Sequence, residues 1–172
     1  KSMYQVGELV SDGSTGVCRV SEIINQTCPD GEERLYYVMQ PLYKACVISV
    51  PVDSDKVFIR PIITRDEADR LIGLIPTMDC PAFHSRVSRE LNEHYTTLLK
   101  SYSCQNWMEM TISIHTKKQW LLSRKRKFGS VDEMYLKQAE ELLFGELAAA
   151  LDIPKEEVRE YIGAKLESLK AS

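Results

Sequence analysis

Basic side chains concentrate in residues 85–127, where their chemistry suits contact with phosphates. This stretch carries nine lysines and arginines against three acids and is therefore +6, in a chain whose total charge is −3. Residues 128–172 have the opposite balance, with five bases and ten acids. Lys and Arg neutralise phosphates and release counterions without requiring an exact spacing. The local surplus indicates a nucleic-acid surface that the total charge conceals.

The candidates for DNA contact form two groups. Arg86 and Arg89 are three residues apart and are expected on one helix face. The second group is Lys117, Lys118, Arg124, Lys125, Arg126 and Lys127. A charge run is often only a solvated face, and that interpretation stands beside the functional one. No recognition-helix pattern of Asn, Gln and Arg occurs, so we expect binding largely independent of base sequence. Contact with about five phosphates predicts a log–log salt slope of about −4.

The sequence lacks the residue patterns of the common catalytic and metal sites. Five scattered cysteines include no C-x-x-C pair, and the three histidines share no ligand spacing with them. We therefore expect reduced thiols, no metal and no cofactor. The phosphate-loop, dinucleotide-binding and H-E-x-x-H motifs are missing. These observations predict a binding protein without catalytic activity and without a small-molecule substrate.

Short apolar runs separated by turn residues fill the first sixty positions. Pro29-Asp30-Gly31 predicts a turn, and Leu35–Met39, Cys46–Val50 and Val57–Ile59 are rich in β-branched and aromatic residues. Five short strands without a helical period indicate a small antiparallel barrel. We expect this domain over residues 3–62.

Helical periodicity begins after residue 62. Thr64–Glu67 and Ser130–Glu133 both read as capping boxes, and Pro76 and Pro154 mark a helix end and a helix start. Further helices are expected over residues 82–100 and 105–122, the latter central because it has two apolar faces. We predict an α+β chain, with a five-helix domain over residues 63–172.

Motifs spread over the chain from Met3 onward resemble those of the CarD/CdnL family of bacterial transcription regulators. In the first half they are Tyr4-Gln-Val-Gly-Glu8, Gly16-Val17, Tyr36-Tyr-Val38, Val50-Pro-Val52 and Arg60-Pro61. In the second half they are Arg89-Glu-Leu91, Leu98-Leu-Lys-Ser101, Lys117-Lys-Gln119 and Tyr135–Leu151. A module related to the first half occurs in the bacterial transcription-repair coupling factor.

The resemblance implies a Tudor/SH3-like β-barrel that binds the RNA polymerase β subunit, and a helical domain that binds promoter DNA. The DNA contact would lie at the upstream edge of the transcription bubble, where it stabilises the open promoter complex during initiation. The implied location is cytoplasmic, with the chain held at the nucleoid through polymerase. The sequence contains no apolar run of about 18 residues and no secretory signal pattern, which agrees with that expectation.

Carried onto this sequence, the resemblance places polymerase contacts at Gln26, Thr27, Ile48, Ser49 and Val50. Some relatives have arginines near two of these places, where this chain has Gln26 and Ser49. The contact is therefore expected to depend more on backbone pairing than on salt bridges. The alternative that these are ordinary strand and loop residues stays open.

A tryptophan that wedges into the minor groove in better-known relatives has no counterpart here. The corresponding stretch is Ser85-Arg-Val-Ser-Arg89, and the nearest aromatic rings, Phe83 and His84, are the candidate substitutes. We expect Trp107 in the core, whereas Trp120 fits either core packing or DNA contact.

Two other binding functions compete with this prediction. One is an RNA- or ribosome-associated protein that uses the same basic surface. The other is a reader of methylated side chains with a cage of Tyr4, Tyr36, Tyr37 and Tyr43. Adjacent strand residues point to opposite faces, so at most one of Tyr36 and Tyr37 could join such a cage. Dimerisation is possible but not indicated.

Overall fold

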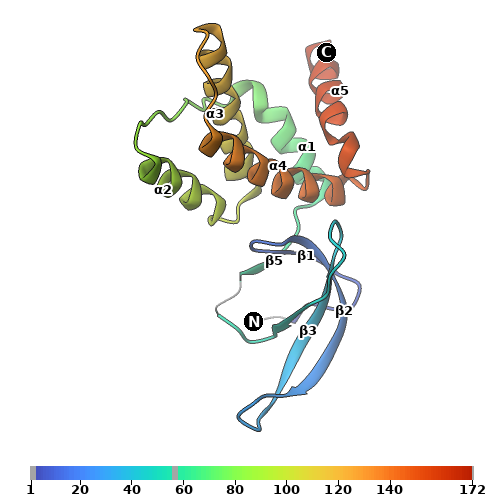
Figure 1. Ribbon diagram of the computed structural model, residues 1–172. Coiled ribbons are helices and arrows are strands. Elements are labelled where there is room, and N and C mark those ends of the chain that lie inside the picture. Colours follow the sequence, from blue (N-terminus) through green and yellow to red (C-terminus); the bar gives the residue numbers. More distant parts are fainter. Residues whose placement is uncertain (1–2, 56–57, 172) are drawn as a thin grey trace. The chain divides into compact units, whose positions relative to one another are not determined.

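The computed structural model describes residues 3–55 and 58–171 and divides into two compact units (Figure 1). The units are residues 1–62, which we call the β domain, and residues 63–172, which we call the helical domain. Val57, the first residue of the last expected strand, lies outside the described residues.

The described residues of the β domain form one antiparallel sheet in the order β4-β3-β2-β1-β5. Its strands are β1 (Leu9–Asp12), β2 (Gly16–Thr27), β3 (Glu33–Pro41), β4 (Ile48–Pro51) and β5 (Ile59–Pro61). The predicted α+β class and the five strands are confirmed. Strands β4 and β5 lie at opposite edges of this sheet, so the closure that would make it a barrel is not confirmed.

The β2–β3 hairpin turns where the sequence predicts. Pro29 and Asp30 occupy the central positions of a turn in which the Gly31 N–H donates to the Cys28 carbonyl at 2.9 Å. Gly31 has a φ of +86°, which glycine adopts without steric cost. The pairing between the two strands places Tyr37 and Met39 in a small buried core with Val20 and Val50.

The described part of the helical domain contains five α-helices and two short 3₁₀ turns. They are α1 (Arg65–Leu74), η1 (Ile75–Thr77), α2 (Ser88–Leu99), α3 (Cys104–Ser123), α4 (Ser130–Leu151), η2 (Lys155–Glu157) and α5 (Val158–Lys170). The Thr64–Glu67 capping box is confirmed, since both reciprocal hydrogen bonds form. Helix α3 occupies nearly the predicted range.

Two expectations about helix starts are wrong. Helix α2 begins at Ser88 rather than near residue 82, because the Ser85 hydroxyl accepts the Val87 N–H at 3.0 Å and holds the chain in a turn. Helix α4 has Gly129 as its N-cap, and none of the described side chains caps it, so Ser130–Glu133 is not a capping box.

The described side chains of the helical domain pack in two core clusters. The apolar cluster includes Trp107, Leu143, Leu147 and Leu151, and Trp107 is fully buried as predicted. The second, called the polar-centred cluster, consists of Leu91, Tyr95, Met110, Ile114, Tyr135, Leu136 and Ala139. Helix α3 contributes to both clusters, which confirms its predicted central place.

Candidate functional site

A cavity of about 600 Å³ opens where the segment before α2, the end of α3 and the start of α4 come together. We call it the basic pocket. Among the described residues its cationic lining is Arg86, Lys117, Arg126 and Lys127, and His84 and Trp120 complete one wall. The first turn of α4, Gly129–Asp132, forms another. A helix N-terminus carries partial positive charge, which adds to that of the side chains.

The end of helix α3 determines where its basic run points. The Lys125 N–H donates to the Leu122 carbonyl at 3.0 Å, and the Arg126 N–H donates to the Leu121 carbonyl at 2.8 Å. This pair of bonds is a Schellman motif, with Lys125 in the left-handed conformation at φ +55°. The chain reverses at Lys125, so Arg126 and Lys127 line the basic pocket and Arg124 and Lys125 do not.

Trp120 lies one turn before Arg124 in α3, and its ring contacts side chains of the same basic run. Its ring is 37% exposed, and the Arg124 guanidinium lies 4.1 Å from the ring centroid. The Arg126 guanidinium lies at 6.0 Å, and the His84 ring contacts Trp120 edge to face at 4.9 Å. Cation–π contacts of this kind restrict the arginine side chains. The sequence contained a signal for this role, because Trp120 and Arg124 are four residues apart on one helix face.

Lys117, one of the predicted DNA contacts, lies at the buried floor of the basic pocket, away from the exposed basic side chains. It is 5% exposed, and its Nζ lies 2.9 Å from Asp132 Oδ1. The Tyr95 hydroxyl donates to the same oxygen at 2.6 Å. Burial, together with this bond to Asp132, raises the pKa of Tyr95, so its hydroxyl stays protonated. The three groups tie α2, α3 and α4 together beneath the basic pocket.

The other basic candidates occupy different places. Arg86 precedes α2 and lines the basic pocket, whereas Arg89 is exposed in the first turn of α2, so the expectation that they share one helix face is wrong. Lys118 is half-buried with its Nζ 5.4 Å from the Phe128 ring centroid. The structure thus brings together Arg86, Arg126 and Lys127 from the predicted set.

The two candidate wedge residues differ in accessibility. Phe83 is half-buried, stacks on His94 with ring centroids 3.9 Å apart and packs against the polar-centred cluster. His84 is exposed beside Trp120. Burial and the nearby Lys117 charge lower the pKa of His94.

In the β domain, the predicted polymerase contacts include an edge strand. In the part of the chain that the structure describes, β4 is bonded to β3 alone, with Val50 opposite Tyr37 and Ser49 opposite Val38. The Val52 N–H donates to the Leu35 carbonyl at 3.0 Å. Val52 and every second residue before it therefore direct their backbone N–H and carbonyl groups toward β3. The backbone N–H and carbonyl of Ser49 therefore point away from the sheet, toward the free edge.

Gln26 and Thr27 lie elsewhere in the β domain. They are exposed at the end of β2, opposite Arg34 and Glu33, with β3 between them and β4. Val50 is 4% exposed, so its side chain packs in the core of the β domain and is not accessible to a partner. The predicted contact set is thus split between an edge strand and a hairpin tip.

Two of the four tyrosines of the rival cage contact each other: the Tyr4 and Tyr37 ring centroids lie 5.7 Å apart. Tyr37 is buried and its hydroxyl accepts the Tyr4 N–H at 3.1 Å, whereas the Tyr36 hydroxyl lies 3.5 Å from Cys28 Sγ.

Burial raises the pKa of the Cys18 thiol to about 12, so this core thiol stays protonated. No group of three potential metal ligands occurs among the described residues.

These features define an α+β protein in which a small β domain with an edge strand at β4 is followed by a helical domain with a basic pocket. Residues 4–63 match the family described as the CarD-like/TRCF RID domain. The N-terminal domain is therefore similar to a CarD-like family of RNA polymerase-interacting domains, a family that interacts with the polymerase β subunit.

The family match is confined to the β domain, and the helical domain is characterised by its own structure. A comparison of the chain with curated proteins gave no match. Within the described residues, none of the helices has the length and apolar character needed to cross a bilayer.

Proposed function

We propose that the chain is a CarD/CdnL-like regulator of transcription initiation. In this proposal the β domain binds the RNA polymerase β subunit, and the helical domain rests on promoter DNA at the upstream edge of the bubble. The observation that carries the proposal is the match of residues 4–63 to a family of RNA polymerase-interacting domains.

The free edge of β4 supports the polymerase contact. An extended segment of a partner adds to an exposed strand edge through backbone hydrogen bonds, which require no particular side chain. Ser49 presents one N–H and one carbonyl on that edge, and Pro51, the next residue on the same side, has no N–H to offer. The donors on this edge are therefore few, and Ser49 supplies one of them.

The basic pocket and its surroundings support the DNA contact. Arg86, Arg126 and Lys127 converge there, and Arg89, Arg124 and Lys125 are exposed nearby in the sequence. Such contacts are weak and insensitive to base sequence, so tethering to polymerase would determine where they act. The wedge of better-known relatives plays no part in this proposal, since Phe83 is packed against His94.

Stabilisation of the open complex would follow from linkage. A protein that binds the open complex more tightly than the closed complex shifts the equilibrium by that difference in affinity. No covalent step is required, so we propose that the chain acts by binding, without catalysis, and that it works in the cytoplasm, where promoter DNA and polymerase are found.

The polymerase contact is tested by binding of the full chain to purified cognate RNA polymerase. Ser49→Pro removes the outward N–H but leaves the β3–β4 hydrogen bonds in place, because proline is tolerated on an edge strand whose N–H faces outward. We expect S49P to weaken binding about tenfold or more, and Ser49→Ala, which keeps the backbone donor, to bind like the unmodified chain. Equal binding by S49P would contradict a contact through the β4 edge.

Nucleic-acid selectivity separates the proposal from an RNA-associated role. Affinities for duplex DNA, forked DNA and structured RNA are to be compared at one salt concentration. Preference for forked or duplex DNA supports promoter binding, and a clear preference for structured RNA contradicts it.

A further inference from the structure

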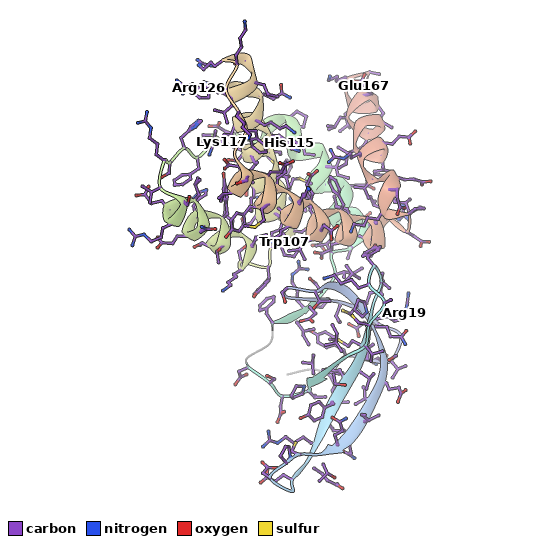
Figure 2. All side chains as sticks on the ribbon, viewed as in Figure 1. Arg19, Trp107, His115, Lys117, Arg126 and Glu167 are labelled. Atoms are coloured by element: carbon purple, nitrogen blue, oxygen red, sulfur yellow. The ribbon has the colours of Figure 1, made fainter. Side chains whose placement is uncertain are left out.

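The basic pocket has a charge balance that suits one anionic group. Four cations and one carboxylate are among its described lining residues. Lys117 and Asp132 neutralise each other through their 2.9 Å contact, which leaves the charges of Arg86, Arg126 and Lys127 uncompensated within the lining. Figure 2 shows Arg126 at the tip of α3 and Lys117 lower on the same helix.

The buried ion pair between Lys117 and Asp132 determines the charge of the pocket floor. Asp132 lies in the first turn of α4, where its negative charge would otherwise oppose an incoming anion. Lys117 cancels that charge from below, and Tyr95 donates a second hydrogen bond to the same carboxylate oxygen. The floor is therefore neutral and polar, and the rim is positive.

The rim is also held in place before any ligand arrives. Trp120 lies within cation–π distance of Arg124 and Arg126, and the Schellman motif at Lys125 fixes the backbone from which Arg126 and Lys127 project. Restricting these long side chains in advance reduces the entropy lost on binding. A phosphate oxygen suits such a site, because guanidinium groups offer paired donors and bind phosphate through charge-assisted hydrogen bonds.

We propose that the basic pocket is a discrete phosphate-binding site that seats a single phosphate group against Arg86, Arg126 and Lys127. The phosphate could belong to a nucleic-acid backbone or to a free nucleotide, and the chemistry of recognition is the same for both. For a backbone phosphate the inference rests on the proposed function and locates its DNA contact. For a free nucleotide it adds a small-molecule ligand to the helical domain.

The test uses the full chain without polymerase and three probes: inorganic pyrophosphate, adenosine diphosphate and a 12-base-pair blunt duplex. Affinity is measured by calorimetry, and protection of Trp120 from acrylamide quenching reports occupancy of the pocket. Trp107 is fully buried and serves as the unresponsive reference. This assay does not involve the β4 edge, so its failure is distinguishable from failure of the polymerase contact.

Arg126→Gln and Lys125→Gln form a matched pair of variants. Each removes one positive charge from an exposed side chain of the same run, but only Arg126 lines the pocket. We expect R126Q to weaken pyrophosphate binding about tenfold and K125Q to weaken it less than about twofold. Far-ultraviolet circular dichroism establishes that both variants are folded.

Competition with the duplex distinguishes the two sources of the phosphate. Pyrophosphate or adenosine diphosphate that binds and competes with the duplex supports a seat for a backbone phosphate. Binding without competition supports a free-nucleotide site. Equal losses in R126Q and K125Q would show a diffuse field with no discrete seat and would overturn the proposal. So would the failure of pyrophosphate and adenosine diphosphate, at millimolar concentration, to protect Trp120.

Discussion

The apolar cluster and the polar-centred cluster belong to the same helical domain and share helices α3 and α4, but their interiors differ. The apolar cluster is built around Trp107 and leucines. The polar-centred cluster contains two tyrosines, and beside it lie buried Asp132 and Lys117. Charged groups are costly to bury, and each cluster has a buried carboxylate beside it. Glu146, beside the apolar cluster, accepts the Ile63 N–H at 2.9 Å, whereas Asp132 is bonded to the buried cation Lys117. The buried lysine is therefore the difference that calls for an explanation.

The position of the polar-centred cluster accounts for the buried lysine. The polar-centred cluster lies beneath the basic pocket, which is lined by Lys117 and Asp132. An apolar core would leave the start of α4 and the end of α3 without a fixed polar link. The ion pair supplies that link and keeps the pocket floor neutral. The two ends of the domain thus satisfy a buried carboxylate in different ways: a backbone N–H bonds Glu146 beside the apolar cluster, and a buried lysine bonds Asp132 beneath the basic pocket.

The largest expected effect is the loss of the buried ion pair. Lys117→Ala leaves the Asp132 carboxylate buried with no opposite charge, which we expect to lower the free energy of unfolding by about 3–5 kcal/mol. Urea denaturation measures the change. Lys118→Ala removes the neighbouring, half-buried lysine and is expected to cost less than about 1 kcal/mol. Similar losses in the two variants would mean that the buried ion pair contributes no more to stability than an ordinary half-buried lysine.

A smaller effect concerns pH and His94, which stacks on Phe83 at the edge of the polar-centred cluster. Because the folded-state pKa of His94 lies below its usual 6.5, the unfolded chain takes up this proton at a higher pH than the folded chain. Stability from this group is present above pH about 6.5 and is lost as the pH falls through the folded pKa.

We therefore expect His94→Gln to reduce the loss of unfolding free energy between pH 7.5 and pH 5.5. Denaturant titrations at both values measure it, with an exposed histidine variant, His84→Gln, as the control. An unchanged pH dependence in H94Q would mean that His94 is not a source of the acid sensitivity.

The smallest expected effect is at Lys125. A residue with a Cβ at φ +55° is strained, and glycine relieves that strain while adding freedom to the unfolded chain. We expect Lys125→Gly to raise the free energy of unfolding by about 0.5 kcal/mol. A loss of stability in the same denaturation assay would argue against the Schellman motif that directs Arg126 and Lys127.

Local signals in the sequence account for most of the fold. The change from alternating to helical periodicity, the Pro29-Asp-Gly31 turn and the Thr64–Glu67 box all act through neighbouring residues, and each has its expected counterpart in the structure. The second capping box failed because α4 begins one residue earlier than expected, with Gly129 as its N-cap, and Asp132 in its first turn is bonded to Lys117, fifteen residues away. No local pattern reveals such a contact.

The site was partly predictable for the same reason. Composition located the basic residues, but a count of charges cannot tell a buried lysine such as Lys117 from an exposed one. The reversal at Lys125 is equally hidden, because a left-handed lysine has no sequence signature comparable to glycine. Trp120 was the exception, since its spacing from Arg124 was visible in the sequence.

The central claim is that one chain holds polymerase and promoter DNA together, and the lifetime of open promoter complexes tests it most directly. The lifetime is measured with cognate RNA polymerase and the full chain, its S49P and R126Q variants, and the matched S49A and K125Q controls. At a chain concentration near the dissociation constant for polymerase, we expect the unmodified chain and both controls to lengthen the lifetime, and S49P and R126Q to lengthen it less. A lifetime that the unmodified chain leaves unchanged would contradict the account.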